Sequence, residues 1–363
     1  MKIVVTSGGT AGHVNPALAV AQELREAGHE LVFAGTPQGL EARLVPAEGF
    51  DYVAFKAAGF NRRKPLTLLS SSFAIAASAA KARTWLRAVK PSVVVGFGGY
   101  VSIPVGLAAS WLGIPLAIHE QNSTSGMANR FLAKRARLVA LTYASAAKDF
   151  KISTEPVCVG NPVRASLLTA NRAAARASFG IPPDATVLLA FGGSLGAQHI
   201  NEALVARAAY LLSLDRLHIL HVTGTRDFPQ IEAMVARIGA AADRWHLIDY
   251  CDRMGDAYAA ADAVLSRAGA TTLAEIGALG IPALLVPYPH AAADEQTANA
   301  RVLVEAQAAD MVADGDLDGL VFTERLARLV TDEVYRGDMR RAARALGGST
   351  AREDLARLII ALG

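Results

Sequence analysis

Cysteine, metal-binding patterns and long hydrophobic runs are all scarce in this sequence. Two cysteines occur in 363 residues, Cys158 and Cys251, and they form neither a disulfide framework nor the paired spacing of a zinc site. There is also no H-E-x-x-H, no D-x-D between apolar strands and no pair of Cys/His ligands. We therefore expect chemistry that uses no bound metal and no other cofactor.

Strong charge of one sign is missing as well. Lysine and arginine total 36 against 33 aspartates and glutamates. This mild excess permits an anionic ligand or an acidic membrane surface, and it predicts no interface with nucleic acid. The apolar run at 65–80 contains four serines and stops at Lys81, short of the roughly 20 residues that a spanning helix needs. Because the N-terminus begins as a strand and not as a signal peptide, we expect a cytoplasmic protein without a transmembrane helix.

The sequence does contain a repeated alternation of short β-branched runs and helical patterns. Runs at 2–7, 30–35, 92–99 and 115–122 are each followed by a helical segment, and a second series starts at 186–193. This alternation is typical of βαβ units around a parallel sheet. We expect an α/β protein with two doubly wound domains, residues 1–162 and residues 163–344, and a C-terminal helix at about 345–363 that packs back on the first.

Glycine-rich turns follow several of the predicted strands. They lie at Gly8–Gly9, Gly98–Gly99, Gly192–Gly193 and Gly269. Because ligands of parallel sheets bind beyond the carboxyl ends of the strands, where helix N-termini favour anions, a phosphate-bearing ligand is expected. The first loop, "TSGGTAGHVNP", lacks the lysine of a P-loop and does not match G-x-G-x-x-G. ATP hydrolysis and NAD-dependent hydride transfer are therefore the weaker interpretations.

The stretch "SRAGATTLAEI" carries the strongest ligand signal of the second half. Gly269 breaks the strand, Thr271 or Thr272 is expected to cap the following helix, and Glu275 lies about one turn further on. A carboxylate at that place accepts hydrogen bonds from ribose hydroxyls, whereas a capping box is the structural alternative. Gln296, at the start of a later helix, is a candidate for sugar hydroxyls, with an ordinary solvated amide as its alternative.

Seven motifs in this order resemble those of the MurG family of bacterial cell-wall glycosyltransferases. They are "GGTAGHVNPALAVA", "GFGGYVSIP", "IHEQN", "VGNPVR", "GGSLGA", "SRAGATTLAEI" and "QTANAR", and together they span nearly the whole chain. The resemblance implies GT-B architecture, with two Rossmann-like domains and a cleft between them. It also implies inverting transfer of N-acetylglucosamine from its UDP donor to an undecaprenyl-diphosphate-linked N-acetylmuramoyl pentapeptide. A UDP-N-acetylglucosamine 2-epimerase, another lipid-directed sugar transferase and a non-catalytic sugar-nucleotide-binding protein are the alternatives.

The resemblance also implies roles for individual positions on the donor side. The first loop would approach the donor sugar, Asn122 its hydroxyls, and Arg164 and Ser194 the nucleotide. Cys251 falls at a position whose backbone would bind uracil. The remaining donor residues implied in this way are Thr10, Ala11, Gly12, Ala270, Thr271, Thr272, Leu273, Ala274, Glu275 and Gln296. Many family members have glycine where Ala11 stands, so we expect the φ angle of Ala11 to be negative.

Displacement of UDP by the muramoyl 4-hydroxyl requires a base. His13 is the leading candidate, because an imidazole with a pKa near neutrality suits proton transfer at cytoplasmic pH. A histidine that only shapes the start of its helix is the alternative. Glu120 is a second candidate base, or else it orients His119 or the loop backbone. Arg164 and the helix start at 270–272 would balance the leaving charge.

The implied lipid acceptor suggests docking on the cytoplasmic face of an anionic membrane. Basic and apolar residues lie together in the segment 59–90, although an ordinary helix facing the core is the alternative. The loop of Gly98, Gly99 and Tyr100 is a candidate cradle for the acceptor diphosphate. Cell-wall and division proteins are candidate partners. The membrane candidates are Arg62, Arg63, Lys64, Leu68, Leu69, Phe73 and Trp85.

Overall fold

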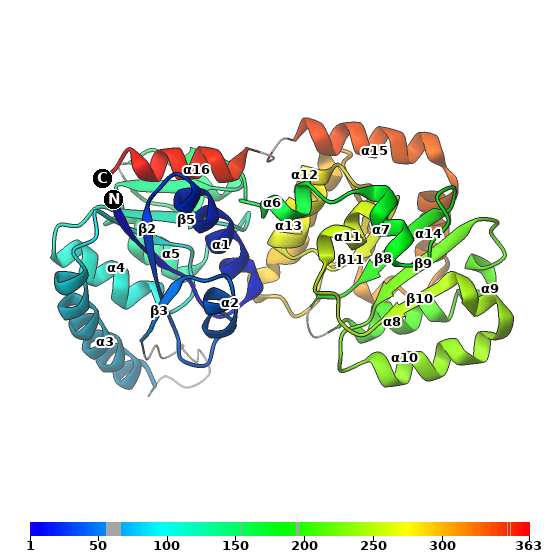
Figure 1. Cartoon of the computed structure of the whole chain (residues 1–363), viewed down its shortest axis with the longest axis horizontal. Coiled ribbons are helices and arrows are strands. Elements are labelled where there is room, and N and C mark those ends of the chain that lie inside the picture. Colours follow the sequence, from blue (N-terminus) through cyan, green and yellow to red (C-terminus); the bar gives the residue numbers. More distant parts are fainter. Residues whose placement is uncertain (56–66, 153, 194–195, 347, 349) are drawn as a thin grey trace. The chain divides into compact units, whose positions relative to one another are not determined.

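The structure is a computed structural model that describes all residues except 56–66, 153, 194–195, 347 and 349 (Figure 1). It divides into two compact units. Unit 1 comprises Met1–Arg164 with Gly348–Gly363, and unit 2 comprises Ala165–Gly347. The sequence places the first boundary at 162 and the last segment at about 345. Among the described residues, no helix combines the length and the apolarity that a membrane crossing requires.

Unit 1 is built on a parallel sheet of seven strands in the order β3-β2-β1-β4-β5-β6-β7. The central strand pairs Thr6 with Ala34 on one side and with Gly96 on the other. Because helices cover both faces, its residues Ile3, Val4 and Val5 are all fully buried and do not alternate in burial. The strands are β1 (Lys2–Thr6), β2 (Glu30–Gly35), β3 (Asp51–Ala54), β4 (Val93–Gly96), β5 (Leu116–Glu120), β6 (Leu138–Leu141) and β7 (Val157–Cys158).

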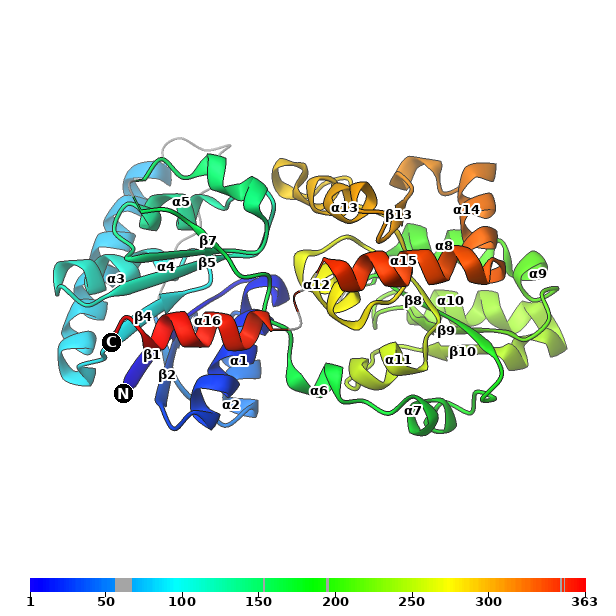
Figure 2. The ribbon, with the colours of Figure 1, turned by 90° about the horizontal axis from the view of Figure 1, so that it is seen from above.

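Two helical layers enclose this sheet. On one face α1 packs beside the C-terminal α16, whose Leu355 and Ile359 enter the same core as Val14 and Leu18 (Figure 2). The other face is covered by α3, α4 and α5, with Leu86, Val105 and Leu132 in the core. The helices of unit 1 are α1 (Ala11–Glu26), α2 (Glu41–Ala47), α3 (Thr67–Val89), α4 (Ser102–Trp111), α5 (Met127–Ala133) and α16 (Ala351–Ile360), with a 3-10 turn at Ala144–Asp149.

Unit 2 repeats the design with six parallel strands in the order β10-β9-β8-β11-β12-β13. Its core is rich in leucine, isoleucine and valine from the strands and from α8 and α14. The strands are β8 (Thr186–Phe191), β9 (Leu217–Val222), β10 (Trp245–Ile248), β11 (Ala263–Ser266), β12 (Ala283–Leu285) and β13 (Asp310–Met311). The prediction of two doubly wound α/β domains is confirmed.

The helices of unit 2 begin beyond the carboxyl ends of its strands or connect them on the surface. α12 follows β11 directly and starts the region that the sequence marks for donor binding. Among the described residues of unit 2, the helices are α6 (Ala165–Leu168), α7 (Arg172–Ser178), α8 (Gln198–Val205), α9 (Ala208–Leu211), α10 (Phe228–Val235), α11 (Met254–Ala260), α12 (Ala270–Leu279), α13 (Glu295–Glu305), α14 (Leu320–Thr331) and α15 (Glu333–Ala345), with 3-10 turns at Ala236–Arg244, Ala292–Asp294 and Asp314–Asp316.

Candidate functional site

The first glycine-rich loop links β1 to α1 in a tight turn. Gly9 has a φ of 95°, a conformation that disfavours residues with a Cβ, and Thr10 is the extended N-cap residue of α1. Ala11 is the first residue of the helix and does not have a positive φ, which agrees with the expectation for an alanine at this position. Of the three residues predicted to approach the donor sugar, Thr10 therefore directly precedes α1, and Ala11 and Gly12 lie in its first turn.

His13 is the third residue of α1, and its side chain is partly exposed. Nδ1 lies 3.2 Å from Thr10 Oγ1, and the ring lies so close to Gly98 that a Cβ at position 98 would stand 2.9 Å from Nε2. Desolvation by burial lowers the pKa of His13, while a hydrogen bond with the backbone of Gly8 and the charge of Glu41 oppose this shift. The imidazole is therefore neutral at pH 7, the form that accepts a proton.

The loop at Gly98 and Gly99 lies directly against the first loop. Both glycines have positive φ angles, and a Cβ on Gly99 would collide with the carbonyl of Gly8. Ser102 Oγ anchors the loop by donating to Gly98 O at 2.6 Å and to Thr6 O at 3.3 Å. Tyr100 is 40% exposed. The structure thus brings the predicted acceptor cradle into contact with the predicted base.

Glu120 ends β5 and is buried, with both carboxylate oxygens engaged. Oε1 accepts from the backbone N–H and the Nδ2 of Asn122 at 3.1 and 3.4 Å, and Oε2 accepts from Gly126 N–H and Asn129 Nδ2, both at 2.9 Å. Burial raises the pKa of Glu120, while these hydrogen bonds lower it. These contacts match the alternative in which Glu120 orients its loop and does not act as a base. They also hold Asn122 in place.

His119 precedes Glu120 and is fully buried. Its Nε2 lies 2.9 Å from Gly160 O, and its Nδ1 lies 3.1 Å from Gln121 Nε2. Burial lowers the pKa of His119 to about 4, so the ring is neutral at physiological pH. The ring nitrogens contact a backbone carbonyl and an amide, which differs from the alternative in which Glu120 orients His119.

Glu41, which sequence reasoning missed, lies under the first loop. It is the first residue of α2 and is fully buried, and its Oε2 accepts a hydrogen bond from Gly9 N–H at 3.2 Å. In the sequence it looks like an ordinary acidic residue in the first turn of a helix. The one available signal is the pair Gly35 and Gly39 just before it, since glycines often mark a close approach.

In unit 2, α12 begins at Ala270 with the extended Gly269 as its N-cap residue. The expectation that Thr271 or Thr272 caps this helix is therefore wrong, because both lie inside the first turn. Thr271 Oγ1 is buried and has no hydrogen-bond partner among the described residues, while the side chain of Leu273 belongs to the core. A buried hydroxyl at a helix N-terminus suits an oxygen-rich ligand.

Glu275 lies on the inner side of α12 and is 9% exposed. Tyr258 Oη, from α11, donates to its Oε2 at 2.8 Å. Glu275 follows the N-cap residue by six positions, whereas a capping box has its acidic residue at the third. The tyrosine orients the carboxylate that the family resemblance assigns to ribose.

Gln296, near the start of α13, connects two loops of unit 2. Its Oε1 accepts from Ala268 N–H at 3.1 Å and from Tyr288 N–H at 2.9 Å. Ala268 follows β11 and Tyr288 follows β12, so a single amide oxygen holds the ends of neighbouring strands together. In the structure, the amide predicted to bind sugar hydroxyls supports the backbone just before α12.

The other predicted donor residues come from separate segments of the chain. Arg164 is the last residue of the first segment of unit 1, and its buried Nε has no hydrogen-bond partner among the described residues. Cys251 follows β10 and is half-buried, and burial raises the pKa of its thiol. Ser194 lies outside the described residues.

The predicted membrane segment is described only in part. Arg62, Arg63 and Lys64 lie outside the described residues, and the side chains of Leu68, Leu69 and Phe73 are likewise not described. Trp85 is described, and its ring packs at 5.2 Å against Phe55, next to the core under α3. At this position the structure has the core-facing arrangement that the sequence analysis gives as the alternative.

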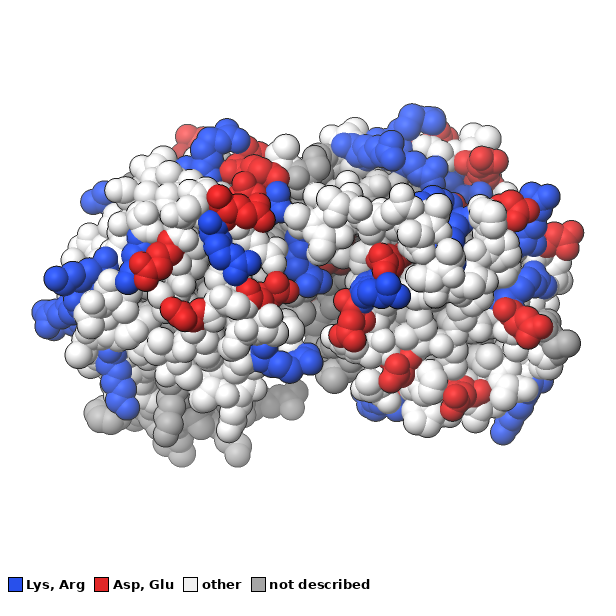
Figure 3. Space-filling view, in the orientation of Figure 1, with Lys and Arg blue, Asp and Glu red and all other residues white. Residues whose placement is uncertain are grey.

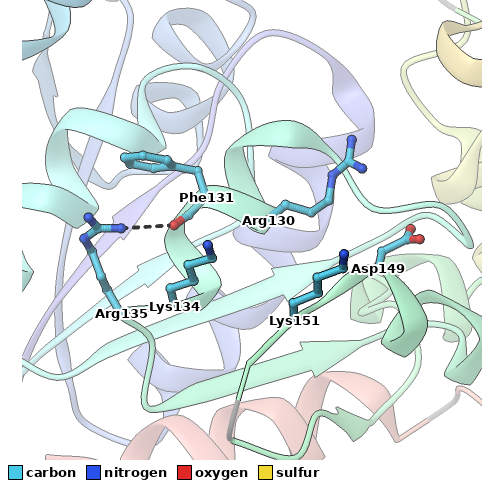
Figure 4. A pocket seen from close by; sticks show the side chains of 6 residues that line it. All are labelled: Arg130, Phe131, Lys134, Arg135, Asp149 and Lys151. Atoms are coloured by element: carbon cyan, nitrogen blue, oxygen red, sulfur yellow. Dashed lines mark hydrogen bonds between the residues drawn. The ribbon is translucent and has the colours of Figure 1, made fainter.

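A basic hollow lies elsewhere on unit 1, at α5 and the following turns (Figure 4). Phe131 is 43% exposed, and the Arg135 guanidinium lies 4.8 Å above its ring. On the face drawn in Figure 3, by contrast, basic and acidic side chains are interspersed. Sequence reasoning missed the hollow because its residues come from two separate segments. They are Arg130, Phe131, Lys134, Arg135, Asp149 and Lys151.

Comparison with known proteins decides the family. The glycosyltransferase family 28 N-terminal domain matches residues 3–141, and the C-terminal domain of that family matches residues 187–359. A protein of Halothermothrix orenii named UDP-N-acetylglucosamine--N-acetylmuramyl-(pentapeptide) pyrophosphoryl-undecaprenol N-acetylglucosamine transferase is 40% identical over 99% of this chain and 98% of its own. The chain belongs to the MurG family of glycosyltransferases.

Solved structures agree with this assignment to the MurG family. The crystal structure of MurG from Acinetobacter baumannii matches with a TM-score of 0.77 and 30% identity, covering 99% of both chains. A UDP-GlcNAc 2-epimerase from Neisseria meningitidis matches with a TM-score of 0.69 at 15% identity, a likeness of fold alone. The predictions of MurG membership, GT-B architecture and glycosyltransferase activity are confirmed, and the epimerase alternative is not favoured.

Proposed function

We propose that the chain transfers N-acetylglucosamine from UDP-N-acetylglucosamine to the 4-hydroxyl of N-acetylmuramoyl pentapeptide on undecaprenyl diphosphate, with inversion. The observation that carries this proposal is 40% identity over essentially the whole chain to a protein named for that transfer. Both Gly-rich loop systems that such a reaction needs are present, one in each unit. The product would be the disaccharide-linked lipid precursor of peptidoglycan.

For the proton transfer we propose His13 as the base. In the reaction the acceptor oxygen forms a bond to the anomeric carbon of the donor sugar, the bond from that carbon to UDP breaks, and the hydroxyl proton passes to the imidazole. Support comes from the neutral state of the ring and from its contact with the Gly98–Gly99 loop, which presents backbone next to it. Glu120 is instead proposed to hold Asn122 toward the donor sugar.

On the donor side we propose that α12 receives the diphosphate. Its N-terminus is the positive end of the helix dipole, and the buried Thr271 hydroxyl lies in its first turn. Glu275, oriented by Tyr258, would accept from ribose hydroxyls, and the backbone at Cys251 would bind uracil. Arg164 would balance the charge of the departing diphosphate.

The decisive experiment measures UDP release with purified protein. Release is expected only when UDP-N-acetylglucosamine and a lipid-linked muramoyl acceptor are both present. Consumption of donor without acceptor would favour an epimerase or a hydrolase. Donor binding without any turnover would favour a non-catalytic sugar-nucleotide protein.

We also propose that unit 1 docks on an anionic membrane surface at the cytoplasmic face. The basic hollow supports this proposal, since four cations and an exposed aromatic residue line it. Sedimentation with phosphatidylglycerol vesicles should be weakened at least tenfold by Lys134→Glu with Lys151→Glu, because each basic residue near such a surface contributes about 1 kcal/mol. Arg216→Glu with Arg237→Glu, in unit 2, is the matched control. Equal binding to phosphatidylcholine vesicles would contradict the proposal.

A further inference from the structure

The carboxylate of Glu41 joins two strand ends of unit 1. Its Oε2 accepts from Gly9 N–H at 3.2 Å, in the loop after β1. Its Oε1 accepts from the N–H and the hydroxyl of Thr36, directly after β2, at 2.9 and 2.6 Å. The residue is fully buried, and burial of a charge is costly unless hydrogen bonds satisfy it. Three donors from two loops meet that requirement.

The surroundings of Glu41 leave room for this side chain and for little else. A Cβ on Gly8 would lie 2.9 Å from its Oε1, and a Cβ on Gly35 would lie 2.6 Å from its Cγ. A Cβ on Gly39 would collide with the carboxylate itself. Tyr52 Oη fixes the far side by donating to Thr36 O at 2.5 Å. The site is therefore shaped to hold one carboxylate in one orientation.

The turn that Glu41 holds is the one that carries His13. Gly8 and Gly9 precede α1, the backbone of Gly8 bonds to the His13 ring, and Gly98 and Gly99 pack on both. We infer that Glu41 is a positioning residue for the transfer, which fixes the Gly8–Gly9 turn and thereby the place of His13. This inference rests on the proposed function, in which His13 receives the acceptor proton.

The charge of Glu41 has a separate effect on the imidazole. It raises the pKa of His13, in opposition to the larger effect of burial. Thr10 contributes a hydroxyl to the surroundings of the ring, and residues 98–99 contribute backbone, so Glu41 is the charged group that acts on it among the described residues. Removal of this charge should lower the pKa of His13. The fall of kcat/KM on the acidic side of its pH profile, called the acid limb here, should then move to lower pH.

The test compares Glu41→Gln with Glu48→Gln, the same change at the end of the same helix. A glutamine at 41 has one acceptor oxygen, so its NH2 group must face either Gly9 N–H or Thr36 N–H. We expect kcat/KM to fall on the order of 10- to 100-fold through misplacement of the base. The acid limb of kcat/KM should also shift to lower pH. The control, whose carboxylate accepts from Gln22, should change neither quantity.

The outcomes separate this inference from the proposed function. If the wild-type protein releases no UDP in the presence of acceptor, the proposed function fails first. If wild type and Glu48→Gln are active and Glu41→Gln matches them, the inference is overturned. A loss of activity with an unmoved acid limb and a lowered melting temperature also overturns it, because a purely structural role explains that result.

A second variant covers the case in which Glu41→Gln does not fold. Thr36→Val removes the 2.6 Å hydrogen bond to Oε1 while it keeps the charge of Glu41. We expect a smaller fall in kcat/KM with an unshifted acid limb. Full activity of this variant would show that the anchoring of the carboxylate does not matter, and would overturn the inference.

Discussion

The loops of the two units are held by side chains that differ by one charge. In unit 1 the carboxylate of Glu41 accepts the N–H of Gly9, and in unit 2 the amide oxygen of Gln296 accepts those of Ala268 and Tyr288. Both braces stand at the start of a helix and both satisfy backbone donors of a neighbouring loop. The geometry is shared, and the charge is not.

The charge of each brace matches the chemistry proposed beside it. A carboxylate near His13 stabilises the imidazolium that forms when the ring takes a proton. A carboxylate near the start of α12 would repel a diphosphate and cancel part of the favourable field of the helix N-terminus, whereas an amide does neither. The difference suggests that the charge of each bracing side chain suits the charge that develops or binds at its loop, an imidazolium in unit 1 and a diphosphate in unit 2.

The largest effect is expected from removal of His13, the proposed base in unit 1. His13→Ala should lower kcat by about 10²–10⁴-fold, the contribution typical of a general base, with little change in the melting temperature. In the wild type, kcat/KM should fall as the pH drops through the lowered pKa of His13, below 6.5, and the variant should lack this limb. His29→Ala is the control. A fully active His13→Ala variant would leave the ring with the role of shaping its helix.

A second prediction concerns the cores, where the two units are alike. Burial lowers the pKa of His119 in β5 to about 4 and that of His221 in β9 to about 3. The unfolded chain takes up a proton at each site near pH 6.5 and the folded chain does not, so stability is present above pH 6.5 and is lost as the pH falls toward 4. For His119 the loss is roughly 3 kcal/mol.

Urea unfolding at a series of pH values measures this loss. His119→Gln keeps a donor for Gly160 O and should remove the part of the acid sensitivity that belongs to His119. His221→Gln should do the same for unit 2. If both variants show the wild-type slope between pH 6.5 and 4, the buried rings are not the source.

The smallest effect is expected when a negative charge is placed at Gln296, the residue that holds the two loops of unit 2. Gln296→Glu can still accept from Ala268 and Tyr288, so the fold should be kept, while the KM for the sugar nucleotide should rise roughly tenfold through repulsion of the diphosphate. Gln307→Glu, two residues beyond α13, is the matched control. An unchanged KM would mean that the charge of the brace is irrelevant, and the comparison between the units would lose its physical basis.

Sequence reasoning reached the parts of the site that depend on short-range pattern. Positive φ angles occur at Gly9, Gly98 and Gly193, where a strand and then a helical pattern flank a glycine pair. Gly269 has no positive φ and serves instead as an N-cap residue, which is why the threonine caps were wrong. Both kinds of glycine look alike in sequence, because a turn and a cap each need only a residue without a restrictive side chain.

Contacts between distant segments escaped prediction. Glu41 and Gly9 are 32 residues apart, and they meet only because parallel strands place the carboxyl ends of β1 and β2 side by side. The partners of Glu120 lie within nine residues, so a local interpretation as a loop-orienting residue was already within reach. The basic hollow combines α5 with residues 149–151 across an intervening strand.

The amino-acid sequence by itself determined the two-fold repetition of strand, glycine turn and helix, and with it the family and the residues next to the proposed chemistry. Those features follow from hydrophobic period and backbone freedom, which act over a few residues. Only the tertiary structure decided the protonation state of His13 and the contacts of Glu41. Each of these depends on desolvation and on hydrogen bonds whose partners come together after the sheet has formed.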